Sequence, residues 1–306
     1  MGAQAWGPDQ MSLSWRSRAL PAVIHLTRAR AYRSAQSARD HIDQRAAHPQ
    51  FYGPPPGLRK DVNLHLDRES VWPIYTLTAQ SLHEPQGTVV YLHGGAWVNE
   101  IASQHWKLAV QIAADACVRV VVPIYPLAPF ATAAEVVPRI AELVAETAMP
   151  DHSVCLAGDS AGGQMALSAA LLLRDEHRLV LPETVLISPV LDVSLTNPLI
   201  DAVDDPWLTR VGLLEFAKRW CGDLPMTDTM VSPLNADLSG LGPLTVFSGT
   251  RDILNPDARL LAEKAAAAGV QIDYHEQPGL VHVYPLTPTP EGRAARALIV
   301  ERLRAN

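Results

Sequence analysis

Residues 158–162, Gly-Asp-Ser-Ala-Gly, are the part of this sequence that most clearly indicates a chemical function. They follow an apolar run that ends at Ala157 and precede a run of small, helix-favouring residues that begins at Gln164. A Gly-x-Ser-x-Gly between a strand and a helix forms a strained turn that exposes the serine hydroxyl. The helix N-terminus behind the serine stabilises negative charge. Ser160 is therefore predicted to be a nucleophile.

A serine hydroxyl is a weak nucleophile near neutral pH unless a base takes its proton, and a histidine base needs a carboxylate to orient it. Where such a turn carries the nucleophile, the chain order is serine, acid, histidine. Asp252 comes just after the apolar run 244–247, and His282 follows the predicted strand 270–275. Ligands of open α/β sheets bind at the carboxyl ends of strands. We therefore predict a triad of Ser160, Asp252 and His282.

Rival candidates for the acid and the base stand at positions that favour simpler roles. Asp257 lies near the start of a predicted helix, where a negative charge is favourable without any catalytic role, and Asp252 itself could simply cap that helix. His177 ends a helix before the next strand, and His275 lies inside a strand. Neither histidine follows the carboxyl end of a strand, as a base must here.

The sequence His-Gly-Gly-Ala-Trp at residues 93–97 follows the apolar run 88–92. Attack of a serine on an acyl carbon generates an oxyanion, which preorganised N–H donors stabilise. Two adjacent glycines let the backbone approach a ligand closely. We therefore predict an oxyanion hole made by the amides of Gly94, Gly95 and Ala161.

Aromatic and apolar residues suggest where a substrate would bind. His93 is expected to brace its loop rather than carry protons. Trp97 is expected to wall the pocket or to pack in the core, and Trp207 and Leu208 stand in a segment without strand signals. A pocket walled by such side chains would suit a small or medium acyl group. The same residues could equally form the core of their own segment.

Apolar runs alternate with helical patterns along most of the chain, which predicts a mostly parallel, doubly wound α/β sheet. Pro73 has no N–H to donate, so the strand around it is expected at a sheet edge. The predicted strands are 62–66, 71–77, 88–92, 118–122, 153–156, 184–187, 244–247 and 270–275, and the predicted helices are 104–116, 133–147, 160–173, 258–268 and 291–304.

Two stretches lack this alternation. Residues 12–48 are rich in Ala, Arg and Ser with helical spacing, and residues 189–242 carry no strand signal. Long insertions in compact domains are usually functional. We predict a helical cap from residues 1–50 and 189–242 over a core formed by residues 51–188 and 243–306. The apolar run 19–26 is short and interrupted, so an amphipathic helix is expected there rather than a signal peptide or a membrane span.

Composition excludes several classes of function. The chain has 306 residues, 48% of them hydrophobic, and a net charge of −7. That charge disfavours nucleic acid and anionic membranes as partners. Cys117, Cys155 and Cys221 are odd in number and widely spaced, which fits neither a disulfide framework nor a zinc site. A reducing, cytoplasmic location is expected.

Taken together, these motifs resemble the hormone-sensitive-lipase-like branch of the α/β-hydrolases, the bacterial family IV esterases. Residues 125–129, Tyr-Pro-Leu-Ala-Pro, and 232–238, Ser-Pro-Leu-Asn-Ala-Asp-Leu, are also similar to segments of that family, whereas Phe130 and residues 253–257 depart from its common forms. The resemblance implies an α/β-hydrolase fold with a helical cap and the same triad and oxyanion residues. It also implies an ester substrate, no cofactor or metal, and a homodimer through the exposed strand 270–275.

Two other functions are compatible with these motifs. Similar machinery cleaves amides, and kynurenine formamidases carry a comparable His-Gly-Gly-x-Trp. Gibberellin receptors of plants are non-catalytic ligand binders on the same scaffold, but they have lost the histidine that stands here at position 282. We therefore expect a carboxylic ester hydrolase that acts through a covalent acyl-enzyme.

Overall fold

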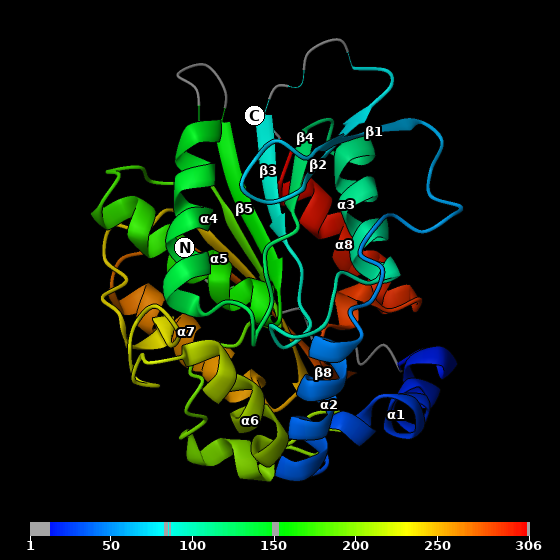
Figure 1. Ribbon diagram of the computed structural model, residues 1–306, viewed down its shortest axis with the longest axis vertical. Helices are drawn as coiled ribbons and strands as arrows, with labels where there is room; N and C mark the ends of the chain where they lie inside the picture. Colours follow the sequence, from blue (N-terminus) through cyan, green and yellow to red (C-terminus); the bar gives the residue numbers. More distant parts are fainter. Residues whose placement is uncertain (1–12, 83–84, 86, 149–152, 305–306) are drawn as a thin grey trace.

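The computed structural model describes residues 13–82, 85, 87–148 and 153–304. Within these residues, eight strands form one sheet in the order β1-β2-β4-β3-β5-β6-β7-β8 (Figure 1). Pairing is antiparallel from β1 to β2 and from β2 to β4, and parallel across the rest of the sheet. The strands are β1 (Val62–Asp67), β2 (Ile74–Ala79), β3 (Gly87–Leu92), β4 (Arg119–Pro123), β5 (Ser153–Asp159), β6 (Thr184–Ile187), β7 (Leu244–Arg251) and β8 (Ile272–Val281).

Helices cover both faces of this sheet, which confirms the predicted doubly wound architecture. α3 (Ser103–Asp115) and α8 (Pro290–Arg302) lie on one face, and α4 (Ala133–Thr147), α5 (Ala161–Asp175) and α7 (Asn255–Ala267) lie on the other (Figure 1). The central strand β3 is consequently buried along its whole length. Continuous apolar runs, rather than alternating ones, are what strands covered on both faces require.

The prediction that Pro73 marks an edge strand is wrong. β2 lies between β1 and β4 and pairs with both. Pro73 stands one residue before β2 begins, so its missing N–H costs no bond in the ladder. Its carbonyl accepts the Ile124 N–H at 2.8 Å. The edges of the sheet are β1 and β8.

The remaining helices gather beyond the carboxyl ends of the central parallel strands (Figure 1). α2 (Ala35–Ala47) packs on α6 (Arg210–Cys221), where Arg39 forms an ion pair with Glu215 at 3.1 Å. η1 (Ala29–Tyr32) packs on α6 as well, with the rings of Tyr32 and Phe216 5.1 Å apart. Gly212 is needed at this contact, since a Cβ there would overlap the Tyr32 backbone. The elements are α1 (Trp15–Thr27), η1 (Ala29–Tyr32), α2 (Ala35–Ala47), η2 (Pro198–Ala202), α6 (Arg210–Cys221), η3 (Pro233–Asn235) and, next to α8, η4 (Tyr284–Leu286).

Apart from η4, these elements come from the two stretches predicted to form a cap. The exact division of the chain at residues 50, 188 and 242 stays a prediction, and residues 1–12 of the predicted cap lie outside the described residues. Of the helices described, none has both the length and the apolar character that crossing a membrane requires.

Candidate active site

Ser160 lies at the turn between β5 and α5, where its backbone adopts φ 53° and ψ −117°. This conformation is costly for a residue with a side chain and persists only where the surroundings impose it. The flanking glycines make the turn sterically feasible. A Cβ at Gly158 would overlap the Gly162 carbonyl, and one at Gly162 would overlap the carbonyl of Leu92 on β3. The turn thus has the geometry that the motif predicted.

The structure brings Ser160, His282 and Asp252 together from the ends of three strands. Asp252 follows β7 and His282 follows β8. His282 Nε2 lies 3.0 Å from Ser160 Oγ, and His282 Nδ1 lies 2.8 Å from Asp252 Oδ2. The other Asp252 oxygen accepts the Leu254 N–H at 3.0 Å, which fixes the carboxylate on both sides. Both Asp252 and His282 are buried.

The surroundings of His282 favour its protonated form. Burial acts to lower the pKa of His282, but the negative charge of Asp252 and the hydrogen bond to it act in the opposite direction and outweigh burial. The pKa of His282 is therefore raised above its ordinary value of 6.5. A histidine in this setting readily accepts a proton that leaves Ser160, since the carboxylate stabilises the imidazolium that results.

The rival acid, Asp257, lies elsewhere. It is buried near the start of α7 and accepts a hydrogen bond from Asn197 Nδ2 at 2.8 Å. Burial raises the pKa of Asp257 to about 6. Its contacts make it part of the packing between α7 and η2, the 3-10 helix that begins next to Asn197.

The glycine loop after β3 is held by a buried carboxylate that sequence reasoning did not single out. Asp159 Oδ1 accepts the Tyr91 hydroxyl at 2.6 Å and the Gly94 N–H at 3.0 Å, while Asp159 Oδ2 lies 3.3 Å from His105 Nε2. The Gly94 amide is thus already bound in this structure. Gly95 has φ 130°, which favours glycine, and Ala161 is the first residue of α5, where N–H groups lack intrahelical partners.

His93 braces the same loop, as expected. Its carbonyl accepts the Tyr125 hydroxyl at 2.6 Å, its Nδ1 lies 2.7 Å from the Gly94 carbonyl, and its ring stacks on that of Tyr125 with centroids 4.5 Å apart. Burial and the neighbouring His105 lower the pKa of His93 to about 4. The ring is therefore neutral near pH 7, which suits a structural role.

The three residues predicted to contact the substrate lie in different environments. Trp97 is buried, and its Nε1–H donates to Gln164 Oε1 at 3.1 Å; Trp220 of α6 donates to the same oxygen at 2.9 Å. Leu208 is also buried. Trp207 packs edge-on against the His282 ring, with centroids 5.4 Å apart. Trp207 thus contacts the Ser160–His282–Asp252 group.

Asp205 is a second residue that sequence reasoning missed. Its carboxylate accepts the N–H groups of Trp207 and Leu208 at 2.7 and 3.0 Å and, with the other oxygen, that of Ile253 at 3.0 Å. It therefore ties the segment before α6 to the turn that carries Asp252. Burial and the charge of Asp252 raise the pKa of Asp205 to about 6. The only sequence signal was its position in an Asp-Pro turn.

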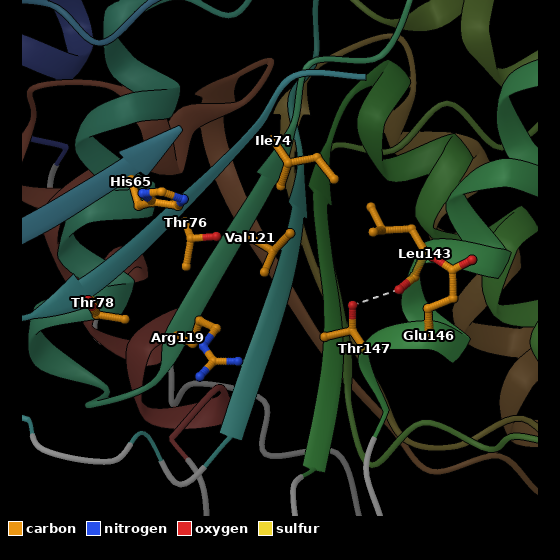
Figure 2. A pocket seen from close by; sticks show the side chains of 9 residues that line it. All are labelled: His65, Ile74, Thr76, Thr78, Arg119, Val121, Leu143, Glu146 and Thr147. Atoms are coloured by element: carbon orange, nitrogen blue, oxygen red, sulfur yellow. Dashed lines mark hydrogen bonds between the residues drawn. The ribbon is translucent and has the colours of Figure 1, made fainter. Parts of the chain in front are cut away.

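A pocket of about 380 Å³ opens beside His282 and Trp207, between α1, α3 and the residues that follow β8. A larger hollow of about 540 Å³ lies elsewhere, on β1, β2, β4 and α4 (Figure 2). Its wall includes His65, Thr76 and Arg119 from the strands and Glu146 from the helix, and it contains none of the predicted site residues. Ser160, Gly94, Gly95 and Ala161 do not line the smaller pocket, but His282 and Trp207 do. We take it as the candidate substrate site because, of these two hollows, it is the one that reaches the predicted triad.

Comparison with known proteins agrees with this geometry. A family model described as the alpha/beta hydrolase fold matches residues 89–286. LipR of Mycobacterium tuberculosis, provisionally named an acetyl-hydrolase, is 30% identical over 260 residues, which are 82% of this chain and 83% of LipR. The carboxylesterase NlhH of the same organism is 31% identical over 230 residues, 69% of this chain and 72% of NlhH.

A solved structure of an esterase from the bacterial hormone-sensitive lipase family superposes with a TM-score of 0.78 at 28% identity, covering 96% of this chain and 99% of that one. The chain therefore belongs to the α/β hydrolase-fold family. Within that family, its place is in the hormone-sensitive-lipase-like branch, as the motifs predicted.

Proposed function

We propose that this protein is a serine carboxylesterase in which Ser160 is the nucleophile, His282 the general base and Asp252 the residue that orients His282. At the level of reaction class, carboxylic ester hydrolysis is also what the names of its relatives indicate. The observation that carries the proposal is the pair of contacts made by His282, 3.0 Å to Ser160 Oγ and 2.8 Å to Asp252 Oδ2.

The reaction follows from this arrangement. Ser160 Oγ attacks the ester carbonyl while His282 Nε2 takes its proton, and Asp252 stabilises the imidazolium. The N–H groups of Gly95 and Ala161 receive the oxyanion. Gly94 was predicted as a third donor, but its N–H is bound to Asp159. In our proposal Gly94 therefore fixes the loop.

The second half of the reaction uses the same groups. His282 returns its proton to the leaving alcohol, and an acyl group remains on Ser160. A water molecule, deprotonated by His282, then attacks this acyl-enzyme and releases the acid. The pocket beside His282, about 380 Å³, is of a size for esters with small or medium acyl groups.

Two mutants and one substrate test this proposal. With p-nitrophenyl butyrate, Ser160→Ala and His282→Ala should each lose turnover by several orders of magnitude, because single knock-outs of a triad cost about 10⁶-fold in a well-studied case. Ser168→Ala provides a control, since Ser168 is a buried serine of α5 whose contacts are with Gln164 and Thr229. Normal turnover by Ser160→Ala would remove the basis of the assignment.

The alternative functions are tested with the same protein. Matched ester and amide substrates distinguish an esterase from a formamide hydrolase. Covalent labelling of Ser160 by a fluorophosphonate distinguishes either enzyme from a ligand-binding receptor. We also propose that the protein is cytoplasmic, in keeping with its three unpaired cysteines. We further propose that it forms a homodimer through β8 at the sheet edge.

A further inference from the structure

The wall of the pocket beside His282 carries positive charge from three different elements. Arg28 comes from the end of α1, Lys107 from α3 and Arg296 from α8. No aspartate or glutamate stands among the described residues that line this pocket. The chain as a whole has a net charge of −7, so the local charge of the pocket is opposite to that of the protein.

These cations keep their charge uncompensated within the part of the chain that the structure describes. None of the three forms an ion pair there. Arg296 donates only to neutral acceptors, the carbonyls of Pro285 and Thr287 and Gln111 Oε1. Lys107 and Arg28 have exposed side chains. Neutral acceptors hold a guanidinium in place without cancelling its charge.

The positive charge lies close to the reacting group. The guanidinium of Arg28 sits 5.2 Å from the centroid of the Trp207 ring, and that ring packs against His282 at 5.4 Å. A single indole therefore separates Arg28 from the proposed base. Apolar side chains complete the wall, among them Leu20 and Ile24.

α1, which ends just before Arg28, is fixed to the core. The Glu291 carboxylate at the start of α8 accepts the Ser14 N–H at 2.6 Å and the hydroxyls of Ser14 and Ser17 at 2.9 and 2.8 Å. These bonds attach the first turn of α1 to α8. The position of Arg28 at the other end of α1 is thus set by the fold.

We infer that the pocket selects esters that carry a negative group, such as a carboxylate, several bonds from the scissile bond and joined to it by an apolar spacer. The apolar wall takes the spacer, and Arg28, Lys107 and Arg296 attract the anion. The inference rests on the proposed esterase function and adds the substrate class. The negative group belongs either to the acid or to the alcohol part of the ester, and the experiment tests each separately.

The test compares matched anionic and neutral esters. On the alcohol side, para-carboxyphenyl butyrate is compared with para-carbamoylphenyl butyrate. On the acid side, monoethyl adipate is compared with the same ethyl ester in which a primary amide replaces the free carboxylate. The measured quantity is the ratio of kcat/KM for the anionic and the neutral ester. At low salt the ratio should exceed one in at least one pair, and it should fall towards one in about 0.5 M NaCl, because salt screens charges separated by several ångströms.

Charge-removing variants test the source of the preference. K107Q and R28Q should each lower the ratio about two- to fivefold, the range expected for an exposed ion pair. K60Q is the matched control, since Lys60 is an exposed lysine outside the pocket. Ratios at or below one in both pairs, or ratios that K107Q and R28Q leave unchanged, would overturn the inference. Loss of activity on the neutral esters in the wild type would instead count against the esterase function.

Discussion

Replacing Asp159 by asparagine should weaken both the fold and the reaction, because this buried carboxylate fixes the glycine loop beside Ser160. Its Oδ1 accepts Tyr91 and Gly94, and its Oδ2 lies 3.3 Å from His105 Nε2. His105 Nδ1 accepts the Ala102 N–H at 2.9 Å, so Nε2 is the ring nitrogen that carries the proton.

The size of the effect follows from these contacts. An asparagine that keeps its oxygen towards Tyr91 and Gly94 places its NH₂ group against the N–H of His105, so a buried donor loses its acceptor. One such loss costs about 1–3 kcal/mol, and the two remaining bonds lose the strengthening given by the charge. We expect a total loss of about 2–4 kcal/mol in the free energy of unfolding. The protein should still fold, since domains have about 5–15 kcal/mol of stability.

Two measurements check this prediction. Urea unfolding of D159N should show a lower midpoint at an unchanged slope, which indicates a change in stability alone. Turnover of p-nitrophenyl butyrate should fall by about tenfold or more, because small displacements of catalytic groups are costly. D223N, which makes the same change at an exposed aspartate, serves as the control. A D159N protein with wild-type midpoint and turnover would refute the role given to Asp159.

Three further predictions follow from other contacts. D252N should lower kcat by about 10⁴-fold, and the acid limb of its pH–rate profile should move to lower pH, since the charge of Asp252 raises the pKa of His282. E183Q should stabilise the protein above pH 7. Burial raises the pKa of Glu183 from 4.5 to about 7, so the wild type loses stability as the pH rises through that value, by up to about 3 kcal/mol. The unfolding free energies of both proteins at pH 5 and 8 measure this difference. Q164L leaves two buried indole N–H groups without their acceptor and should cost about 2–4 kcal/mol in urea unfolding.

The features that could be predicted from the sequence are those that produce a recognisable local sequence pattern. A Gly-x-Ser-x-Gly after an apolar run fixes the turn at Ser160, and chain order then selects Asp252 and His282 among many acids and histidines. Apolar runs and helical spacing were enough to place most strands and helices to within three residues, but β7 and β8 continue to Arg251 and Val281, beyond the predicted ends at 247 and 275. Each of these signals depends on neighbours in the sequence.

The contacts that the sequence did not predict join residues far apart in the chain. Asp159 reaches Tyr91, Asp205 reaches Ile253, and Gln164 accepts from two tryptophans, and no periodicity reports such pairings. The sequence could not decide whether Trp97 walls the pocket or packs in the core. The structure gives its indole N–H a buried acceptor, which a surface pocket wall would not need.

The most direct test of the proposed mechanism is to locate the acyl group on the enzyme. Wild-type protein is mixed with p-nitrophenyl butyrate, quenched in acid during turnover, digested and mapped by mass spectrometry. The mechanism predicts a butyryl group on the peptide that contains Ser160 and on no other peptide. Steady ester hydrolysis with the butyryl group on a different residue, or with no acyl-enzyme and no fluorophosphonate adduct at Ser160, would contradict it.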